Sequence, residues 1–304
     1  MMAREERLLG DGARHLLDLY RDGQYAPLLA EVDQLAKEGQ VGAPELGLTA
    51  LALTALERHE EAVKAAGEAV KRAPDQAWLH DTLAAAEAGL GRLERATEAQ
   101  RRAAQLLPGE PAYTARLAKY QRLNGEHDLA VRTARQALLT DPGHPEALNE
   151  LGLALQATGD TAGALAQFRA AQEAAPAAAE AYVNEGVLHL RAGARGEARR
   201  AFRAAVQRRP GWEEAENYLV RSMTGERGPL TATLLHLLNL GRFTLVGWLI
   251  VAFLYYLLFR LLEFVWKAWP ATLPLGRGLL MATLVYLLGG LAVGKVLRFL
   301  LRRS

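Results

Sequence analysis

Arginines crowd one stretch of the chain and offer the most distinctive chemistry in the sequence. Arg195, Arg199 and Arg203 recur every four residues, a spacing that places side chains on one face of a helix. Arg200 lies among them. Guanidinium groups bind phosphate oxygens well, and acidic lipid headgroups attract basic residues near a membrane. Two interpretations stay open: a lipid-contacting surface made of Arg195, Arg199, Arg200 and Arg203, or an ordinary solvated helix face.

Patterns that would indicate catalysis or metal binding are absent from the sequence. There is no cysteine, which excludes disulfides, thiolate metal sites and cysteine nucleophiles. There is no Walker-type phosphate loop and no His-Glu-x-x-His motif, and the seven histidines are scattered. We therefore predict that the protein is not an enzyme, and that it has no cofactor and no metal site.

Charge divides the chain into two parts. From Glu226 onward, nine Lys or Arg residues stand against two Glu residues, which gives this tail a net charge of +7. Since the whole chain carries +2, the first 225 residues carry −5. An acidic part of this kind lacks the basic surface that nucleic acid requires, so we predict no nucleic-acid partner.

The basic tail is also apolar and contains two uncharged runs, residues 243–259 and 278–294. Each run has 17 residues, slightly fewer than the roughly 20 that cross a bilayer, but flanking basic side chains extend the reach. We predict two membrane spans, near 243–262 and 278–294. One span with an interfacial helix and a buried core helix pair are the alternatives. Gly290 and Gly294 have a spacing that favours close helix packing, which makes self-association through the spans an option.

Lysine and arginine placement predicts the orientation of these spans. Seven basic residues flank the two runs on the outside and three lie between them, which favours cytoplasmic ends. The charged N-terminus is followed by no apolar signal segment. The excess of arginine over lysine is typical of a bacterial genome rich in GC. We expect an integral protein of a bacterial inner membrane, with its N-terminal part and its C-terminus in the cytoplasm.

Prolines reveal an internal repeat in the first part of the chain. Five of the twelve prolines are spaced 34 residues apart: Pro74, Pro108, Pro142, Pro176 and Pro210. Alanine stands twelve residues before each of them, at Ala62, Ala96, Ala130, Ala164 and Ala198. Glycine stands seventeen residues before the last four, at Gly91, Gly125, Gly159 and Gly193. Glycine suits a left-handed turn, and proline ends a helix, so each unit predicts two helices joined by a short turn.

This pattern resembles the tetratricopeptide repeat family, whose 34-residue units carry small, aromatic and proline positions in this order. The fourth and fifth units match the motif best, through Gly152, Ala164, Phe168 and Pro176, and through Gly186, Ala198, Phe202 and Pro210. Gln100 and Ala134 replace the aromatic residue in the second and third units, where we expect looser packing. The resemblance implies an all-α solenoid of helical hairpins, here followed by a transmembrane helical hairpin.

The resulting domain organisation has four parts. We predict a degenerate repeat at 1–42, five repeats at 43–212, a capping helix and linker at 213–229, and the membrane domain at 230–304.

The resemblance also implies where a partner binds. In this family the first helices of successive repeats line a concave surface that grips peptides, through residues two, five, six, nine and twelve of each unit. Those positions give the candidate groove residues Trp78, Asp81, Arg116, Lys119, Arg122, Asn149, Glu150, Asn184 and Asn217. Asparagine can hydrogen-bond both groups of a peptide backbone, and the basic trio of the third unit is expected to meet an acidic segment. An ordinary solvated helix face is the alternative.

Taken together, the sequence predicts a membrane-anchored adaptor that binds a protein or peptide partner in the cytoplasm, with the lipid bilayer as a second contact. The alternative is a non-catalytic docking subunit of a membrane or envelope-assembly complex.

Overall fold

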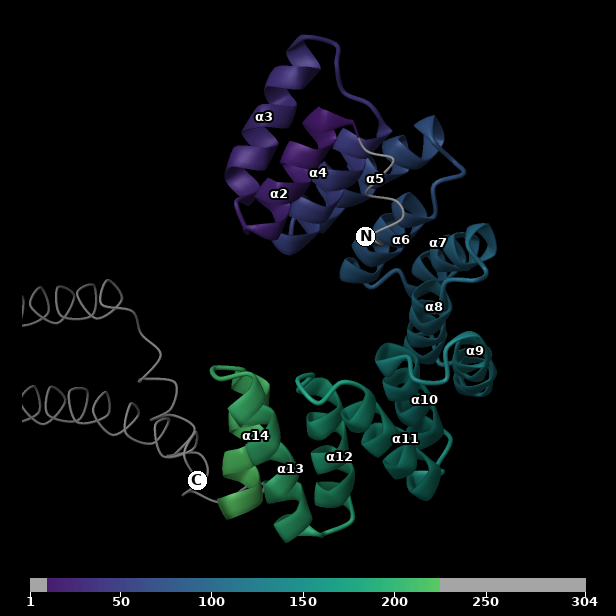
Figure 1. The fold of residues 1–304 in the computed structure, drawn as a ribbon, viewed down its shortest axis with the longest axis vertical. Coiled ribbons are helices and arrows are strands. Elements are labelled where there is room, and N and C mark those ends of the chain that lie inside the picture. Colours follow the sequence, from purple (N-terminus) through teal and green to yellow (C-terminus); the bar gives the residue numbers. More distant parts are fainter. Residues whose placement is uncertain (1–9, 225–304) are drawn as a thin grey trace, which may run out of the picture. The chain divides into compact units, whose positions relative to one another are not determined.

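The computed structural model describes residues 10–224 of the chain, and these residues fold entirely into helices (Figure 1). The chain divides into two units, residues 1–176 and 177–304, and each is described by itself. The N-terminal unit contains the helices α2 (Asp11–Arg21), α3 (Tyr25–Lys37), α4 (Ala43–Ala55), α5 (His59–Arg72), α6 (Ala77–Gly89), α7 (Leu93–Leu106), α8 (Pro111–Leu123), α9 (His127–Thr140), α10 (Pro145–Ala157) and α11 (Thr161–Ala174). The described part of the C-terminal unit contains α12 (Glu180–Arg191), α13 (Arg195–Arg208) and α14 (Glu213–Thr224).

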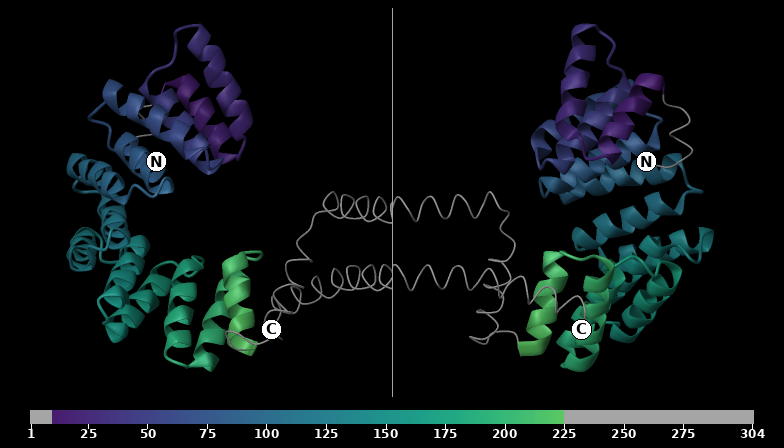
Figure 2. Two further views of the ribbon diagram at one scale, coloured as in Figure 1. Left: turned by 180° about the vertical axis from the view of Figure 1, so that it is seen from behind. Right: turned by 60° about the vertical axis from the view of Figure 1, so that its left-hand side comes forward.

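Helical hairpins stack in sequence order within the N-terminal unit, as the views of Figures 1 and 2 agree. The two helices of each hairpin pack together, from α4 with α5 to α10 with α11. Each second helix also contacts the first helix of the next hairpin, as α5 does α6, α7 does α8, and α9 does α10. First helices contact one another as well, α4 with α6 and α8 with α10. The predicted architecture of stacked helical hairpins is thus confirmed for the described residues.

The turn between the two helices of a hairpin has the left-handed backbone that the glycine spacing predicts. The glycines at this position have φ angles of 72°, 83°, 92° and 75°, in Gly91, Gly125, Gly159 and Gly193. In the first full hairpin the same position is Glu57, the one non-glycine residue with positive φ, 60°, among residues 10–224. The left-handed region costs a residue with a Cβ roughly 1–2 kcal/mol, so packing elsewhere must hold Glu57 there.

Alanines on the 34-residue spacing lie at the buried helix contacts. Ala62, Ala96, Ala130, Ala164 and Ala198 are all 0% exposed. In the last two hairpins a glycine of the first helix faces a phenylalanine of the second, and a Cβ added at Gly152 or Gly186 would lie 2.5 Å from the facing ring. Small and large residues therefore complement each other across these hairpins.

The hairpins without the aromatic residue are equally well buried. Gln100 and Ala134, where we expected looser packing, are both 0% exposed. The Gln100 side-chain amide donates a hydrogen bond to the Tyr113 carbonyl oxygen at 3.1 Å. Their facing residues, Ala84 and Ala118, are alanines rather than glycines and are also buried. These positions are therefore buried in the second and third hairpins as well.

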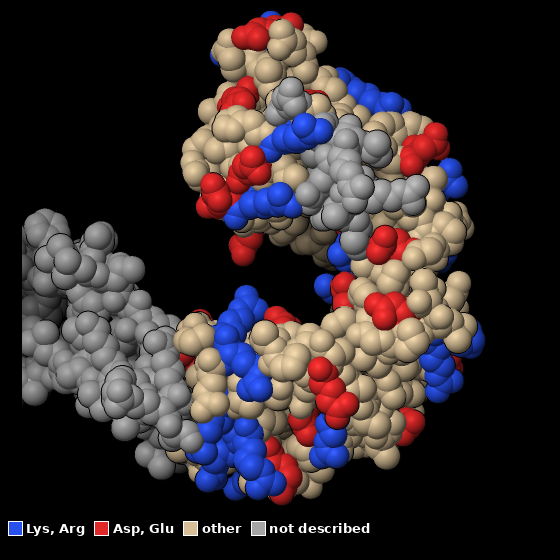
Figure 3. Space-filling model, in the orientation of Figure 1, with Lys and Arg blue, Asp and Glu red and all other residues tan. Residues whose placement is uncertain are grey.

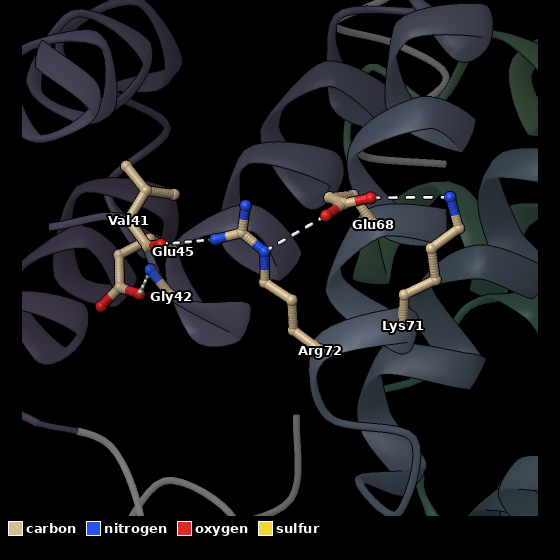
Figure 4. Close-up of polar contacts among 6 residues, drawn as sticks. All are labelled: Val41, Gly42, Glu45, Glu68, Lys71 and Arg72. Atoms are coloured by element: carbon tan, nitrogen blue, oxygen red, sulfur yellow. Dashed lines mark hydrogen bonds and ion pairs between the residues drawn. The ribbon is translucent and has the colours of Figure 1, made fainter. Parts of the chain in front are cut away.

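The hairpin α2/α3 is joined to the first full hairpin through both its core and its connecting segment. Leu16 and Leu28 share a buried cluster with Leu48 of α4. Arg72, at the end of α5, donates a hydrogen bond to the Val41 carbonyl oxygen at 2.6 Å (Figure 4).

Two carboxylates stabilise the connection between the hairpin α2/α3 and the first full hairpin. Glu68 lies 3.3 Å from Arg72 and 3.6 Å from Lys71, which orients the Arg72 guanidinium (Figure 4). The Glu45 carboxylate accepts a hydrogen bond from the Gly42 N–H at 2.8 Å and so caps α4. The start of α4 is therefore held from two sides, by its own cap and by the end of α5.

In the C-terminal unit, α14 packs on α13 and covers its apolar face. The Phe202 and Tyr218 rings stack with centroids 5.2 Å apart and an interplanar angle of 10°. Leu219 and Val220 of α14 join Val206 of α13 in the same buried cluster.

None of the helices within residues 10–224 combines the length and the apolar character needed to cross a bilayer. The spans predicted near 243–262 and 278–294 lie outside the described residues, as do the predicted linker at 225–229 and the whole segment 230–304.

Candidate functional site: the first-helix faces

We call the positions two, five, six, nine and twelve of each 34-residue unit the first-helix face. In the N-terminal unit this face carries a chain of ion pairs across α6, α8 and α10. Arg116 of α8 donates a hydrogen bond to Asp81 of α6 at 2.5 Å, and its Nε lies 3.5 Å from the Glu146 carboxylate of α10. Burial alone would lower the pKa of Arg116, but the charges of Asp81 and Glu146 outweigh it and raise the pKa.

A second ion pair joins α8 to α10. The Nε and one terminal nitrogen of Arg122 donate hydrogen bonds to a single Glu150 carboxylate oxygen, at 3.1 and 2.9 Å. The Glu150 side chain is only 8% exposed. Burial raises the pKa of the Glu150 carboxyl, and Arg122 opposes that rise. The pair is therefore largely removed from water, where loss of one partner leaves an uncompensated charge.

The basic trio expected to meet an acidic partner is thus largely neutralised within the protein itself. Arg116 and Arg122 are paired, and Lys119 lies over the Tyr120 ring, 5.9 Å from its centroid. The structure brings Asp81, Arg116, Arg122 and Glu150 together as a structural network between hairpins.

Trp78 lies in the core rather than on an exposed surface. It is 3% exposed, and its indole N–H donates a hydrogen bond to the Gln76 side chain at 2.9 Å. The ring occupies the space beside Gly47 of the preceding first helix, where an added Cβ would overlap it. Asn149 and Asn184 are half-buried on α10 and α12.

The first-helix face of α14 lines an open pocket of about 380 Å³. Trp212, Glu213, Glu214, Asn217, Tyr218 and Arg221 line this pocket. Two aromatic rings form its walls, and cations lie over both: Arg209 is 5.1 Å from the Trp212 ring centroid and Arg221 is 5.8 Å from that of Tyr218.

Asn217 supplies the unsatisfied polar group of this pocket. Its side-chain carbonyl oxygen is buried and has no hydrogen-bond partner within the described part of the chain. A buried acceptor left without a donor costs about 1–3 kcal/mol. The oxygen has no accessible surface in this conformation, so a ligand N–H recovers that loss only where the side chains that cover it move aside. We call the six pocket residues the α14 pocket.

Sequence reasoning missed Glu146 and the aromatic walls of the α14 pocket. Glu146 occupies position two of its unit, and Trp212 directly precedes α14. The sequence did contain a signal for Glu146. It lies about one repeat length from Arg116, and neighbouring hairpins place residues at that spacing side by side.

The arginines of α13 fall into two groups. Arg200 lies 2.9 Å from Glu197 on the same helix. Arg195 is exposed, whereas Arg199 and Arg203 are half-buried. In the face shown in Figure 3, Lys and Arg side chains gather over the α13 and α14 end of this unit. Within residues 10–224, no group of three or more His, Asp or Glu residues is arranged to hold a metal ion.

Comparison with known proteins agrees with this architecture. A family model described as tetratricopeptide repeat matches residues 116–179 and 150–211. The crystal structure of the APC/C hetero-tetramer Cut9–Hcn1 is similar with a TM-score of 0.60 and 18% identity, over 73% of this chain and 44% of that chain. A thermophilic repeat protein of Thermus thermophilus, TTC0263, is similar with a TM-score of 0.54 and 18% identity, over 60% of this chain and 99% of that one.

At this identity the two structures show the fold alone, and this chain spans less than half the length of the Cut9–Hcn1 chain. No curated protein matches the sequence. The predicted tetratricopeptide repeats are confirmed by the family model and by the fold.

Proposed function

We propose that this protein is a membrane-anchored adaptor that binds an extended segment of a partner protein at the α14 pocket. Its repeats place the pocket, and its basic apolar tail holds the repeats at a bacterial inner membrane, on the cytoplasmic side. The role is binding rather than catalysis, because the polar groups of the first-helix faces serve as hydrogen-bonding and ion-pairing groups.

The observation that carries this proposal is the aromatic-walled pocket that Asn217 lines, together with the unpartnered carbonyl oxygen of that residue. An extended peptide supplies backbone N–H groups at regular spacing, and its side chains would pack against Trp212 and Tyr218. Tetratricopeptide repeats commonly bind such segments on first helices, which agrees with the position of Asn217 in its unit.

The anchor rests on the sequence of the tail. Two uncharged 17-residue runs separated by basic residues support a pair of spans with both ends in the cytoplasm. Anchoring confines the pocket to a thin layer at the membrane and so raises the effective concentration of the pocket for a membrane-bound partner.

Peptide display on the full-length chain in lipid nanodiscs tests the binding proposal. We expect random peptides to be enriched, and the double substitution Asn217→Ala with Tyr218→Ala to abolish their binding. Arg101→Gln serves as the matched control, because Arg101 lies on α7 and only pairs with the exposed Glu98. Enriched peptides that bind the double variant as well as the wild type would move the site elsewhere.

Alkaline extraction of membranes tests the anchor separately. We expect the full-length protein to stay in the membrane pellet after carbonate treatment. Release into the supernatant would contradict the proposed spans without affecting the peptide result.

A further inference from the structure

Three arginines of α13 share one face and form what we call the arginine stripe: Arg195, Arg199 and Arg203. Their i, i+4 spacing sets neighbouring side chains about 5–6 Å apart at the Cβ atoms. Arg195 is exposed, and the other two are half-buried. Side chains at this spacing can hold one ligand or neighbouring ligands jointly.

Within the described residues, the stripe has no acidic partner, whereas other arginines of this unit do. Arg200 lies 2.9 Å from Glu197, and Arg209 lies 3.1 Å from Glu180. Two further arginines cover rings, with Arg208 at 3.9 Å from the Tyr182 centroid and Arg221 at 5.8 Å from that of Tyr218. The positive charge of the stripe is therefore left uncompensated by carboxylates of residues 10–224.

Arg199 occupies a position that is uncharged in every earlier hairpin. The corresponding residues at 34-residue spacing are Val63, Thr97, Val131 and Leu165. Val63 packs against the next first helix, in a cluster with Ala86 of α6. Arg199 meets the equivalent place on α14, where its guanidinium donates a long hydrogen bond of 3.5 Å to the Ser222 carbonyl oxygen. Where the earlier hairpins carry an apolar or neutral residue at this helix contact, the last hairpin therefore carries a charged one.

Two of these guanidinium groups also hold donors that nothing in the described chain satisfies. The Nε atoms of Arg199 and Arg203 are both buried and lack a hydrogen-bond partner. Guanidinium donors match the oxygens of phosphate in a two-point geometry, and the pairing is stronger than a neutral hydrogen bond. Because these two Nε atoms have no accessible surface, they do not themselves reach an external ligand. The charge and the spacing of the stripe are the features that suit phosphate groups.

We propose that the arginine stripe binds the phosphates of acidic phospholipid headgroups and so lays α13 against the membrane surface. This inference rests on the proposed anchoring. Thr224, the last described residue, precedes the first uncharged run by 19 residues, a reach of at most roughly 65 Å. Under the proposed anchoring the stripe is tethered to the membrane within this reach, which favours lipid over an acidic protein segment as the source of the oxygens.

A fluorescent label beside the stripe tests this proposal in the full-length chain. The protein has no cysteine, so Gly196→Cys gives one labelling site, and an added Cβ there meets no atom within 4 Å. Gly67→Cys on α5 is the matched control, with equally free space. The probe is a nanodisc with nitroxide-labelled headgroups, made of phosphatidylcholine alone or mixed with phosphatidylglycerol.

We expect quenching of the label at position 196 in the anionic discs and not in the neutral ones, with no such difference at position 67. Changing all three stripe residues to glutamine should return the signal to its neutral-lipid level, because each arginine near an anionic surface contributes roughly fivefold in affinity. The corresponding triple lysine variant should retain most of the quenching, which separates lost charge from lost folding. Arg200→Gln should reduce the quenching less than the change of any one stripe residue, because Arg200 is already paired with Glu197.

Equal quenching in the two lipid compositions, or quenching that survives the triple glutamine change, would overturn the proposal while the anchor stands. A chain that does not co-elute with either disc would instead overturn the anchoring and this inference with it.

Discussion

Two first helices, α8 and α14, carry polar residues on their first-helix faces but in opposite states. On α8, Arg116 and Arg122 are committed to carboxylates of the neighbouring helices. On α14, Asn217 keeps a buried carbonyl oxygen without a partner and lines a pocket with two aromatic rings. On α8, Gln121 has such an oxygen too, but it lies outside the first-helix face. Residues on the first-helix face, which the repeat pattern predicts to bind a partner, can therefore join neighbouring hairpins instead.

The difference has an energetic consequence for binding. A ligand at α8 must replace ion pairs that are already formed and half-buried, so it exchanges similar contacts and gains little. A ligand at α14 is close to a group that the protein leaves unsatisfied, and it packs against two half-buried aromatic rings. The number of charges on a helix face is thus a poor guide to its binding site.

The largest expected effect concerns the ring that supports the α14 pocket. Phe202→Ala should cost about 3–5 kcal/mol of stability, because it removes a fully buried ring. Phe168→Ala should cost a similar amount, since Phe168 is also 0% exposed. Only Phe202 stacks on Tyr218 of the pocket. Thermal unfolding measures both costs, and peptide titration below the transition should show weaker binding for Phe202→Ala alone.

Equal loss of peptide binding in the Phe202→Ala and Phe168→Ala variants would contradict a specific role of Phe202 in supporting the α14 pocket. Such a result would indicate that any loosening of the hairpins disturbs the site.

Arg122→Ala tests whether the ion pair between α8 and α10 stabilises the protein. The substitution leaves the Glu150 carboxylate, 8% exposed, without its counter-ion and should cost about 3 kcal/mol of stability. Arg101→Ala removes a pair between exposed side chains of the same unit and should cost less than about 1 kcal/mol. Chemical unfolding of both variants measures the difference. Similar costs would show that the pair on α8 contributes no more than a surface ion pair.

The pH dependence of stability should distinguish Glu150 from an exposed carboxylate. Because burial raises the folded-state pKa of Glu150, its contribution is fully present below the unfolded pKa of about 4.3 and is lost as pH rises through the folded value. Stability of the wild type relative to Glu150→Gln should therefore increase as pH falls from 7 toward that value.

Glu61 provides a control of opposite sign. Its hydrogen bond with Arg58 lowers the pKa of the Glu61 carboxyl, so its contribution is present above the unfolded pKa and is lost as pH falls through the lower folded value. Stability of the wild type relative to Glu61→Gln should fall over the acidic range. Matching slopes for the two variants would contradict the assigned environments.

Much of the fold could be predicted because it depends on residues that allow few backbone conformations or few side-chain sizes. A proline that ends a helix, a glycine in a left-handed turn and alanines such as Ala62 at helix contacts restrict the backbone directly. Repetition at 34 residues then fixes the register of the hairpins. Glu57 shows the limit, since its left-handed backbone follows from its neighbours in the repeat and not from its own preference.

The site was less predictable because side chains combine across hairpins. Repeat position alone placed Trp78 on the first-helix face, but Gly47 on the preceding helix leaves room for the ring, which is buried there. Arg122 was predicted to meet an acidic segment of a partner, but Glu150 lies within reach once α8 and α10 pack together. Such pairings depend on rotamers and packing, which spacing along the chain does not specify.

A comparison of Asn217→Ala with Asn149→Ala tests whether the partner binds at the α14 pocket. Both asparagines hold position five of their units, on α14 and α10. Titration of a selected peptide into the full-length chain should show affinity reduced about tenfold for Asn217→Ala, equivalent to roughly 1.4 kcal/mol, and unchanged for Asn149→Ala. A loss for Asn149→Ala with none for Asn217→Ala would place the partner on the N-terminal unit and contradict the account.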